Sequence, residues 1–245
     1  MTEPPAGTIQ PAEAWTETAE EKALREGPLI GKPVRMGHGS SGVNVSYSIE
    51  IEGAGRAVFK PRNGEVQSRQ SIAHGTHYLR EVAAFRLDRL LDFRVVPVTV
   101  MRTIDGEVGS VQLWVVIDGW LTGHLKVDAA RMGVLDYILG NTDRNVFNNR
   151  TQDEGRPSAI DNGLCLPRDS RDPIRSRWTR NHINQPLPDE VLGVVRKLSP
   201  ERVASVLAEL GIEDDAVVGL LRRLEEIANT GKILGAAWGG EIKGT

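Results

Sequence analysis

The stretch Asp136-Tyr-Ile-Leu-Gly-Asn-Thr-Asp-Arg-Asn-Val-Phe-Asn-Asn149, followed by Ala159-Ile-Asp-Asn-Gly163, is the most informative part of this chain. It combines Asp143, Asn148 and Asp161, the residue set that ATP-dependent phosphoryl transfer needs. One carboxylate orients the attacking hydroxyl, while an amide and a second carboxylate hold Mg²⁺ on the phosphates. A polar turn is the alternative, because Asn and Asp are common turn residues. The apolar runs that lead into both segments favour a site.

We therefore expect Asp143 to be the catalytic residue, with Asn148 and Asp161 as ligands of Mg²⁺, or of Mn²⁺ in its place. Mg²⁺ is a hard cation that commonly takes one or two protein oxygens beside phosphates and waters. The cofactors predicted from these residues are ATP and the divalent metal.

The bulk composition is that of a globular protein. The chain has 245 residues, 40% hydrophobic and 26% charged, and a net charge of -3, so no nucleic-acid partner is expected. Its one cysteine, Cys165, allows no disulfide within the chain. No apolar run is long enough to span a membrane, and residues 1–26 are too polar and acidic for a signal peptide. We expect a cytoplasmic location.

Strand patterns come first along the chain and helix patterns later. This order predicts an α+β protein with a two-lobed protein-kinase-like fold: an N-terminal antiparallel sheet lobe and a small, mainly helical C-terminal lobe. The expected division is a flexible tail over 1–28, an N-lobe over 29–118 and a C-lobe over 119–245. Strands are expected over 43–51, 56–60, 94–102 and 108–117, and helices over 70–91, 128–139, 189–198, 199–210 and 214–230.

Two further features upstream fit a nucleotide site. Gly37-His-Gly-Ser-Ser-Gly42 lies between two expected strands, and its backbone N–H groups could face phosphate oxygens. Lys60 closes an apolar strand, and Glu81 on the following helix would be its carboxylate partner. The alternatives are a glycine-rich hairpin turn, an exposed lysine and a solvated glutamate. The order of all these elements favours the site, with Gly39, Ser40, Ser41, Gly42, Lys60 and Glu81 binding ATP.

Four segments resemble a known family: "VFKP" ending near Lys60, "REVAAFRLDRLLDFRVVPVT", "DYILGNTDRNVFNN" and "AIDNGLCLP". They are similar to the phosphatidylinositol 3-/4-kinase-like catalytic domain, the type II phosphatidylinositol 4-kinases most of all. More distantly, they resemble HipA-type kinases and secretory-pathway kinases of the same atypical fold. The likeness runs from about Gly37 to Pro167.

The resemblance implies the same roles for Lys60, Asp143, Asn148 and Asp161. It also implies a nucleotide hinge near 112–117, where Gln112, Trp114 and Val115 would bind ATP. The cysteine-rich loop and other membrane-binding elements of the eukaryotic lipid kinases have no counterpart in this sequence. The acceptor is therefore open: a protein, a small molecule or an inositol-lipid headgroup.

An arginine-rich segment follows Asp161 and could bind an anionic acceptor. The alternative is a solvated loop, partly neutralised by Asp169 and Asp172. The candidate acceptor-binding residues are Arg168, Arg171, Arg175 and Arg177.

Three functions are compatible with these residues. The first is an ATP- and Mg²⁺-dependent kinase, a phosphotransferase whose partners are a nucleotide and a hydroxyl-bearing acceptor. The second is a nucleotide-binding pseudokinase that acts as a scaffold. The third is an adenylyltransferase on the same fold. The full set of acid and metal-ligand residues favours the kinase.

Overall fold

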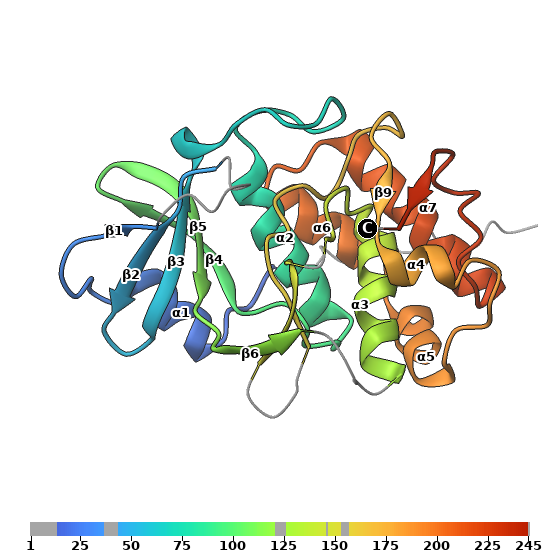
Figure 1. Cartoon of the computed structure of the whole chain (residues 1–245), viewed down its shortest axis with the longest axis horizontal. Coiled ribbons are helices and arrows are strands. Elements are labelled where there is room, and N and C mark those ends of the chain that lie inside the picture. Colours follow the sequence, from blue (N-terminus) through green and yellow to red (C-terminus); the bar gives the residue numbers. More distant parts are fainter. Residues whose placement is uncertain (1–13, 37–43, 121–125, 146, 153–156, 245) are drawn as a thin grey trace, which may run out of the picture.

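The computed structural model describes residues 14–36, 44–120, 126–145, 147–152 and 157–244. A sheet lobe and a helical lobe lie side by side, with helix α2 (His77–Leu90) between them (Figure 1). This confirms the predicted α+β, kinase-like fold class. In the described parts, no helix is long and apolar enough to cross a membrane.

The sheet lobe contains five strands in the order β1-β2-β3-β5-β4, and every neighbouring pair is antiparallel. A two-residue turn joins its last two strands: Asp105 and Gly106 both have positive φ, at 52° and 84°. This is the geometry that matches the twist of a hairpin, and it favours the Asp-Gly pair. The strands are β1 (Val34–Arg35), β2 (Tyr47–Ile51), β3 (Gly55–Pro61), β4 (Thr99–Ile104) and β5 (Glu107–Leu113).

Because side chains alternate along the strands, one face of this sheet packs in a core and the other lines a cavity. On one face, Phe59 pairs with Val111 in register, and both are buried in a core with Leu24 of helix α1 (Ala19–Glu26). The next residues along the strands point the other way, so Val58, Lys60 and Gln112 line a cavity instead. The side chain of Lys60 enters the cavity because that of Phe59 enters the core.

Two element boundaries differ from the sequence prediction for identifiable reasons. The helix expected over 70–91 begins only at His77, after Gly75 with φ at 75°. The strand expected over 94–102 begins at Thr99, because the backbone N–H groups of Val95 and Val96 donate to the carboxylate of Asp88. Strand β4 lies at the edge of the sheet, the position at which a proline such as Pro97 beside a strand is tolerated.

The described part of the predicted flexible tail, residues 14–28, is anchored to the rest of the molecule. Helix α1 starts with a capping box at Thr18 and Glu21. Leu24 is fully buried against the sheet, and Glu21 forms an ion pair with Arg89 of α2. These contacts supply the burial that a flexible tail would lack. Residues 1–13 lie outside the described parts.

The helical lobe is built around α3 (Lys126–Leu139), which packs against α4 (Arg177–Asn181), α5 (Asp189–Lys197) and α7 (Asp214–Thr230). Helix α6 (Pro200–Glu209) lies against α2 and α7. Its start is the predicted one, with Ser199 accepting from the backbone of Arg202. Short strands complete the lobe: β6 (Ile117–Trp120), β7 (Asn149–Gln152) and β8 (Pro157–Ala159) form one sheet, and β9 (Ile174–Arg175) pairs with β10 (Ile242–Lys243). The predicted boundary between the lobes, after residue 118, falls inside β6.

The end of α3 delivers the polar segment quoted first. Gly140, with φ at 63°, ends the helix in the left-handed conformation that glycine adopts most easily. Buried Arg223 of α7 lies against this glycine and donates to the carbonyl of Ile138. The chain therefore turns sharply away from the helical core and places Asn141–Arg144 towards the sheet lobe.

Candidate active site

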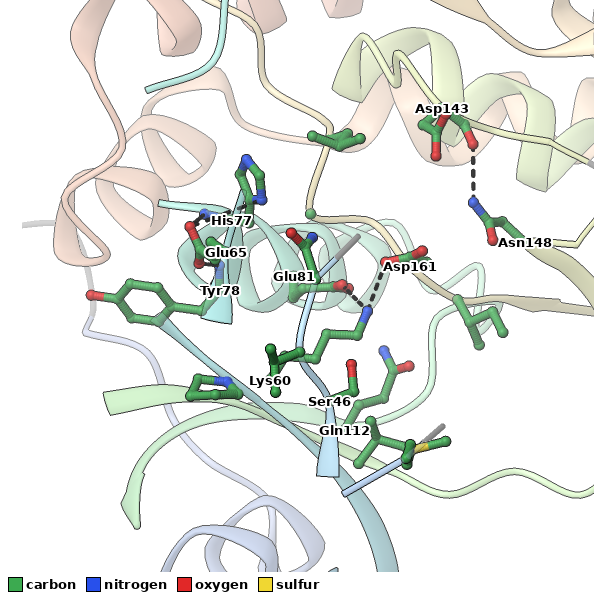
Figure 2. Close-up of a pocket in the computed structure, with 18 of the residues that line it drawn as sticks. Ser46, Lys60, Glu65, His77, Tyr78, Glu81, Gln112, Asp143, Asn148 and Asp161 are labelled. Carbon is green, nitrogen blue, oxygen red and sulfur yellow. Dashed lines mark hydrogen bonds and ion pairs between the residues drawn. The ribbon is translucent and has the colours of Figure 1, made fainter. Parts of the chain in front are cut away.

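A cavity of about 540 Å³ lies where the sheet lobe, α2 and the segment after α3 meet. Seven predicted site residues line it and, together with Arg69, form three groups. We name them the phosphate end (Lys60, Glu81 and Asp161), the acceptor end (Asp143 with Arg69) and the base end (Gln112, Trp114 and Val115). Asn148, the predicted amide ligand, also lines the cavity (Figure 2).

At the phosphate end, the ammonium of Lys60 contacts two carboxylates. It pairs with Glu81 of α2 and, at 2.8 Å, with Oδ1 of Asp161, as Figure 2 shows. Burial disfavours the charged amine, but the negative charges of Asp161 and Glu81 outweigh it and raise the pKa of Lys60. Attraction to Lys60 in turn lowers the pKa of Asp161. Lys60 and Asp161 are therefore both ionised at neutral pH, with the cation ready to meet phosphate oxygens.

The segment Asp161–Gly163 is held against α2 by its backbone. Glu81 accepts a hydrogen bond from the backbone N–H of Asn162 at 2.9 Å while it pairs with Lys60. A Cβ atom on Gly163 would come within 3.1 Å of the Cβ of His77, so glycine permits this close approach. Asp161 itself has φ at 57°, a left-handed conformation that Asp tolerates better than most residues. Glu81 thus fixes both Lys60 and the segment Asp161–Gly163.

At the acceptor end, Asp143 is held by an arginine that the sequence did not single out. Nη2 of Arg69 donates to Oδ1 of Asp143 at 3.0 Å and to the carbonyl of Thr142 at 3.3 Å. Burial raises the pKa of the Asp143 carboxyl; the charge of Arg69 opposes this rise, and that of Asp161 adds to it. A partly desolvated carboxylate of raised pKa is a better proton acceptor than an exposed one.

The polar segment between these ends is organised by Arg144, which is fully buried. Its guanidinium donates to the carboxylate of Asp136 at 2.9 Å and to the carbonyls of Asn148 and Ile160. It also donates to the side chain of Asn162. One buried cation therefore ties the end of α3 to both predicted metal-ligand segments. Breaking such a pair costs several kcal/mol, because the remaining charge stays buried.

Asn148 and Asp161 fit a hard divalent cation. The amide nitrogen of Asn148 donates to the carbonyl of Asp143 at 3.0 Å, so the amide oxygen is the group that would ligate. The carboxylate of Asp161 is 52% exposed, on the cavity side. Among the described residues, no three acidic, histidine or cysteine side chains form a metal cluster by themselves. A metal here would take its other oxygens from phosphates and water, as Mg²⁺ commonly does.

The base end has an apolar character with one buried amide. Gln112 and Trp114 come from the end of β5 and the residues after it, and Val58 and Ile160 line the same cavity. The indole of Trp114 is covered by the guanidinium of Arg56, 3.7 Å from the ring centroid. Of the predicted glycine-rich turn, Gly39, Ser40, Ser41 and Gly42 lie outside the described residues, while Ser46 beyond it lines the cavity (Figure 2).

The four arginines predicted to bind an acceptor do not gather at the cavity. None of them is among its lining residues. Arg171 is exposed and bonds Asp169 through Nε and Nη2, at 2.9 and 2.7 Å. Of the four, Arg175 lies near enough for its charge to oppose the rise in the pKa of Asp143 that burial causes. Arg168 and Arg177 are exposed elsewhere on the lobe. The cation at the acceptor end is instead Arg69.

Several cavity residues were not predicted from the sequence, above all Arg69, Glu65 and His77. Glu65 accepts from the backbone N–H groups of His77 and Tyr78, and so caps the start of α2 (Figure 2). His77 is buried, and burial with the charge of Arg80 lowers its pKa to about 4. Glu65 and Arg69 precede the predicted helix and follow no hydrophobic pattern, and nothing in the pattern of that helix marked His77 as a cavity residue. The charge of Glu65 before a helix was the one available signal.

Two family models match successive parts of the chain. Residues 22–111 match the family described as Fam20C: Golgi casein kinase, C-terminal, Fam20. Residues 120–212 match phosphatidylinositol 3- and 4-kinase. No curated protein matches the chain in sequence.

Solved structures share the fold. One is the Golgi casein kinase with Mn/ADP bound, with a TM-score of 0.59 and 16% identity over 86% of this chain and 74% of that one. The structure of hydra Fam20 with sugar has a TM-score of 0.54 and 16% identity, over 91% of both chains. The Helicobacter pylori proinflammatory kinase CtkA has a TM-score of 0.53 and 11% identity, over 88% of this chain and 96% of that one.

At these identities the structures establish the fold, and the family matches carry the class. Both matched families are kinases, which confirms the predicted resemblance to the phosphatidylinositol 3-/4-kinase-like domain and its atypical relatives. The class that fold and matches define together is a phosphotransferase with a kinase-like fold.

Proposed function

We propose that this chain is an ATP- and divalent-metal-dependent kinase that transfers the γ-phosphate to a hydroxyl acceptor. The observation that carries the proposal is the meeting of the phosphate end and the acceptor end in one cavity. Lys60, Asp143 and Asp161 come from three separate parts of the sequence, and they lie together as phosphoryl transfer requires.

The transfer itself is a displacement at the γ-phosphorus. The hydroxyl oxygen of the acceptor bonds to phosphorus, the bond to the oxygen bridging the β- and γ-phosphates breaks, and ADP leaves. Asp143 orients the hydroxyl and accepts its proton. Lys60, held by Glu81, stabilises charge on the phosphate oxygens.

Asn148 and Asp161 would hold the metal, which when bound would neutralise charge on the phosphates. In the structure Asp161 pairs with Lys60. When nucleotide and metal bind, this ion pair would separate. Lys60 would turn to the phosphates, and the carboxylate of Asp161 would ligate the metal. ADP with Mn in one kinase of the same fold supports nucleotide and divalent metal at this cavity.

The acceptor stays open between a protein, a small molecule and an inositol-lipid headgroup. The cytoplasmic location expected from the sequence likewise stays a prediction. The acceptor end favours a hydroxyl compound that tolerates a nearby guanidinium, because Arg69 contacts Asp143 directly.

Labelled nucleotide tests the reaction. The protein is incubated with Mg²⁺ or Mn²⁺ and ATP labelled at the γ- or the α-phosphate, together with protein, sugar and lipid acceptors. We expect transfer of the γ label alone, lost on chelation with EDTA. Transfer of the α label would identify an adenylyltransferase. Tight metal-dependent binding without any transfer across the acceptors would favour the pseudokinase.

A further inference from the structure

The base end of the cavity contains a hydrogen-bond chain that fixes the direction of a buried amide. The hydroxyl of Thr99 donates to the carbonyl of Pro97 at 2.7 Å. Nε2 of Gln112 donates to the oxygen of Thr99 at 3.0 Å. Thr99 and Gln112 are partners across β4 and β5 and are both buried.

This chain admits one orientation of the Gln112 amide. A threonine hydroxyl has a single hydrogen, and here the Pro97 carbonyl takes it. The oxygen of Thr99 can then only accept, so it must face the NH₂ group of Gln112. The amide oxygen Oε1 consequently points away from Thr99, and Gln112 lines the cavity. Among the described residues, no donor contacts Oε1. Oε1 is also not one of the fully buried side-chain atoms that have no hydrogen-bond partner.

Two neighbouring backbone donors are already used within the protein. The N–H of Leu113 donates to the carbonyl of Val98 at 2.8 Å, and that of Trp114 to the carbonyl of Arg56 at 2.9 Å. The other groups described at this end include the apolar Val58 and Ile160. A flat base entering here would meet the Gln112 oxygen as an acceptor fixed in place.

We infer that Gln112 reads the base of the bound nucleotide and that Thr99 positions it, so that adenine is accepted and guanine rejected. The inference rests on the proposed function, in which a nucleotide occupies this cavity. Adenine carries an amino group at position 6, a donor that satisfies Oε1, whereas guanine carries an acceptor oxygen there. Two acceptors facing each other in a buried site lose a hydrogen bond and leave both oxygens unsatisfied.

The test measures binding, which makes it independent of whether phosphate is transferred. Dissociation constants for ATP, GTP and inosine triphosphate are determined by calorimetry with Mg²⁺ present. Inosine has the 6-oxo group without the 2-amino group of guanine, so discrimination against it comes from the oxygen at position 6 and the adjoining N1–H rather than from position 2. The wild-type protein is expected to prefer ATP over both by about 10- to 100-fold.

Matched variants assign the preference to the two residues. Thr99→Val keeps the shape of the side chain and removes the acceptor, so the amide can turn and offer its NH₂ group to a 6-oxo base. The ratio of ATP to inosine triphosphate affinity should fall towards one. Thr99→Ser keeps the hydroxyl and should keep the ratio. Gln112→Met removes the amide at similar volume and should abolish the preference, which covers the case where Thr99→Val does not fold.

Three results would overturn the inference. A wild-type protein that binds all three nucleotides equally would show that nothing reads position 6. An unchanged ratio in Thr99→Val and Gln112→Met would place the reading elsewhere. If the folded wild-type protein bound no nucleotide at all, the proposed function would fail, and this inference with it.

Discussion

The phosphate end and the acceptor end of the cavity are both built around a carboxylate and a cation, but the cations differ in origin and consequence. Lys60 lies on a strand, and a helix carboxylate holds it from behind. Arg69 lies on a connecting segment, lines the cavity and donates directly to the carboxylate of Asp143. Lys60 and Glu81 of the phosphate end lie on two regular elements, whereas Arg69 and Asp143 of the acceptor end both lie on irregular segments.

This difference has a chemical meaning. In the proposed reaction, Lys60 would contact the phosphates of the nucleotide, which all kinases bind. Arg69 contacts Asp143, the residue proposed to receive the acceptor hydroxyl, so it would act on the part of the reaction that varies between kinases. Changes at the phosphate end should alter nucleotide binding, and changes at the acceptor end should alter transfer.

The largest effect separating the two ends is expected from Asp143→Asn. Loss of the proton acceptor should lower the transfer rate about 100- to 10,000-fold. The dissociation constant for Mg·ATP should stay within about threefold, because Asp143 contacts Arg69 rather than Lys60. Rates are measured with γ-labelled ATP and affinity by calorimetry. Asp169→Asn, in the loop outside the cavity, is the control, and a matching loss of nucleotide affinity in Asp143→Asn would argue against the separation.

Glu81→Gln should have the next largest effect, with the opposite signature. The variant removes one of the two charges on Lys60 and weakens the contact to the backbone of Asn162. We expect Mg·ATP affinity to fall about 10- to 100-fold, the range for a hydrogen bond to a charged group. Glu50→Gln, exposed on β2, is the control. An unchanged affinity would mean that Lys60 does not need its helix partner.

The same difference, between regular elements and irregular segments, explains how much of each end could be predicted from the sequence. Lys60 and Glu81 were predictable because regular elements have periods: the strand alternation that buries Phe59 also points Lys60 into the cavity. Asp143 and Asp161 were placed by motif spacing and by the apolar runs that precede them. The structure brings all four together, over distances in sequence of up to 101 residues.

The rest could not be predicted, because irregular segments have no period. Arg69 reaches Asp143 across 74 positions from a connection without hydrophobic pattern. The arginines after Asp161 mark a segment rich in positive charge, but their number does not tell which way each side chain points. Arg171 pairs with its neighbour Asp169 instead of facing the cavity. Arg144 lies inside the quoted motif, yet its burial ran against the general exposure of arginine.

Arg69→Gln should change the pH dependence of transfer. Burial raises the pKa of Asp143, and the charge of Arg69 opposes that rise. Without Arg69 the pKa rises further, so the ionised carboxylate is lost at a higher pH. The acid limb of the pH–rate profile should therefore move to higher pH, with the rate recovering as pH increases. Steady-state rates between pH 5 and 9 measure this, with Arg168→Gln as the control.

The two possible roles of Arg69 give different profiles. A shifted acid limb with little loss at high pH assigns Arg69 to the charge state of Asp143. A uniform loss at every pH, together with a raised KM for the acceptor, would assign it to acceptor binding and contradict the prediction.

The smallest effect is expected at the N-terminal segment, far from both ends. The indole of Trp15 lies near two guanidinium groups of α2, 4.9 Å from Arg86 and 4.6 Å from Arg89, and donates to Glu21 at 2.9 Å. Trp15→Ala should lower the free energy of unfolding by about 1–2 kcal/mol, the sum of two modest cation–π contacts and some lost packing. Urea denaturation measures it, with Trp15→Phe as the variant that keeps an aromatic ring.

This variant also distinguishes the two ends of the cavity. Helix α2 carries Glu81 and contributes nothing to the pair of Arg69 and Asp143. If Trp15 stabilises α2, then Trp15→Ala should weaken Mg·ATP binding by about 0.5 kcal/mol, roughly two- to threefold, because the substitution is distant from the site. The rate at saturating ATP should stay unchanged. A fall in that saturating rate with unaltered affinity would show instead that the segment acts on the acceptor end, and the division drawn between the two ends would be wrong.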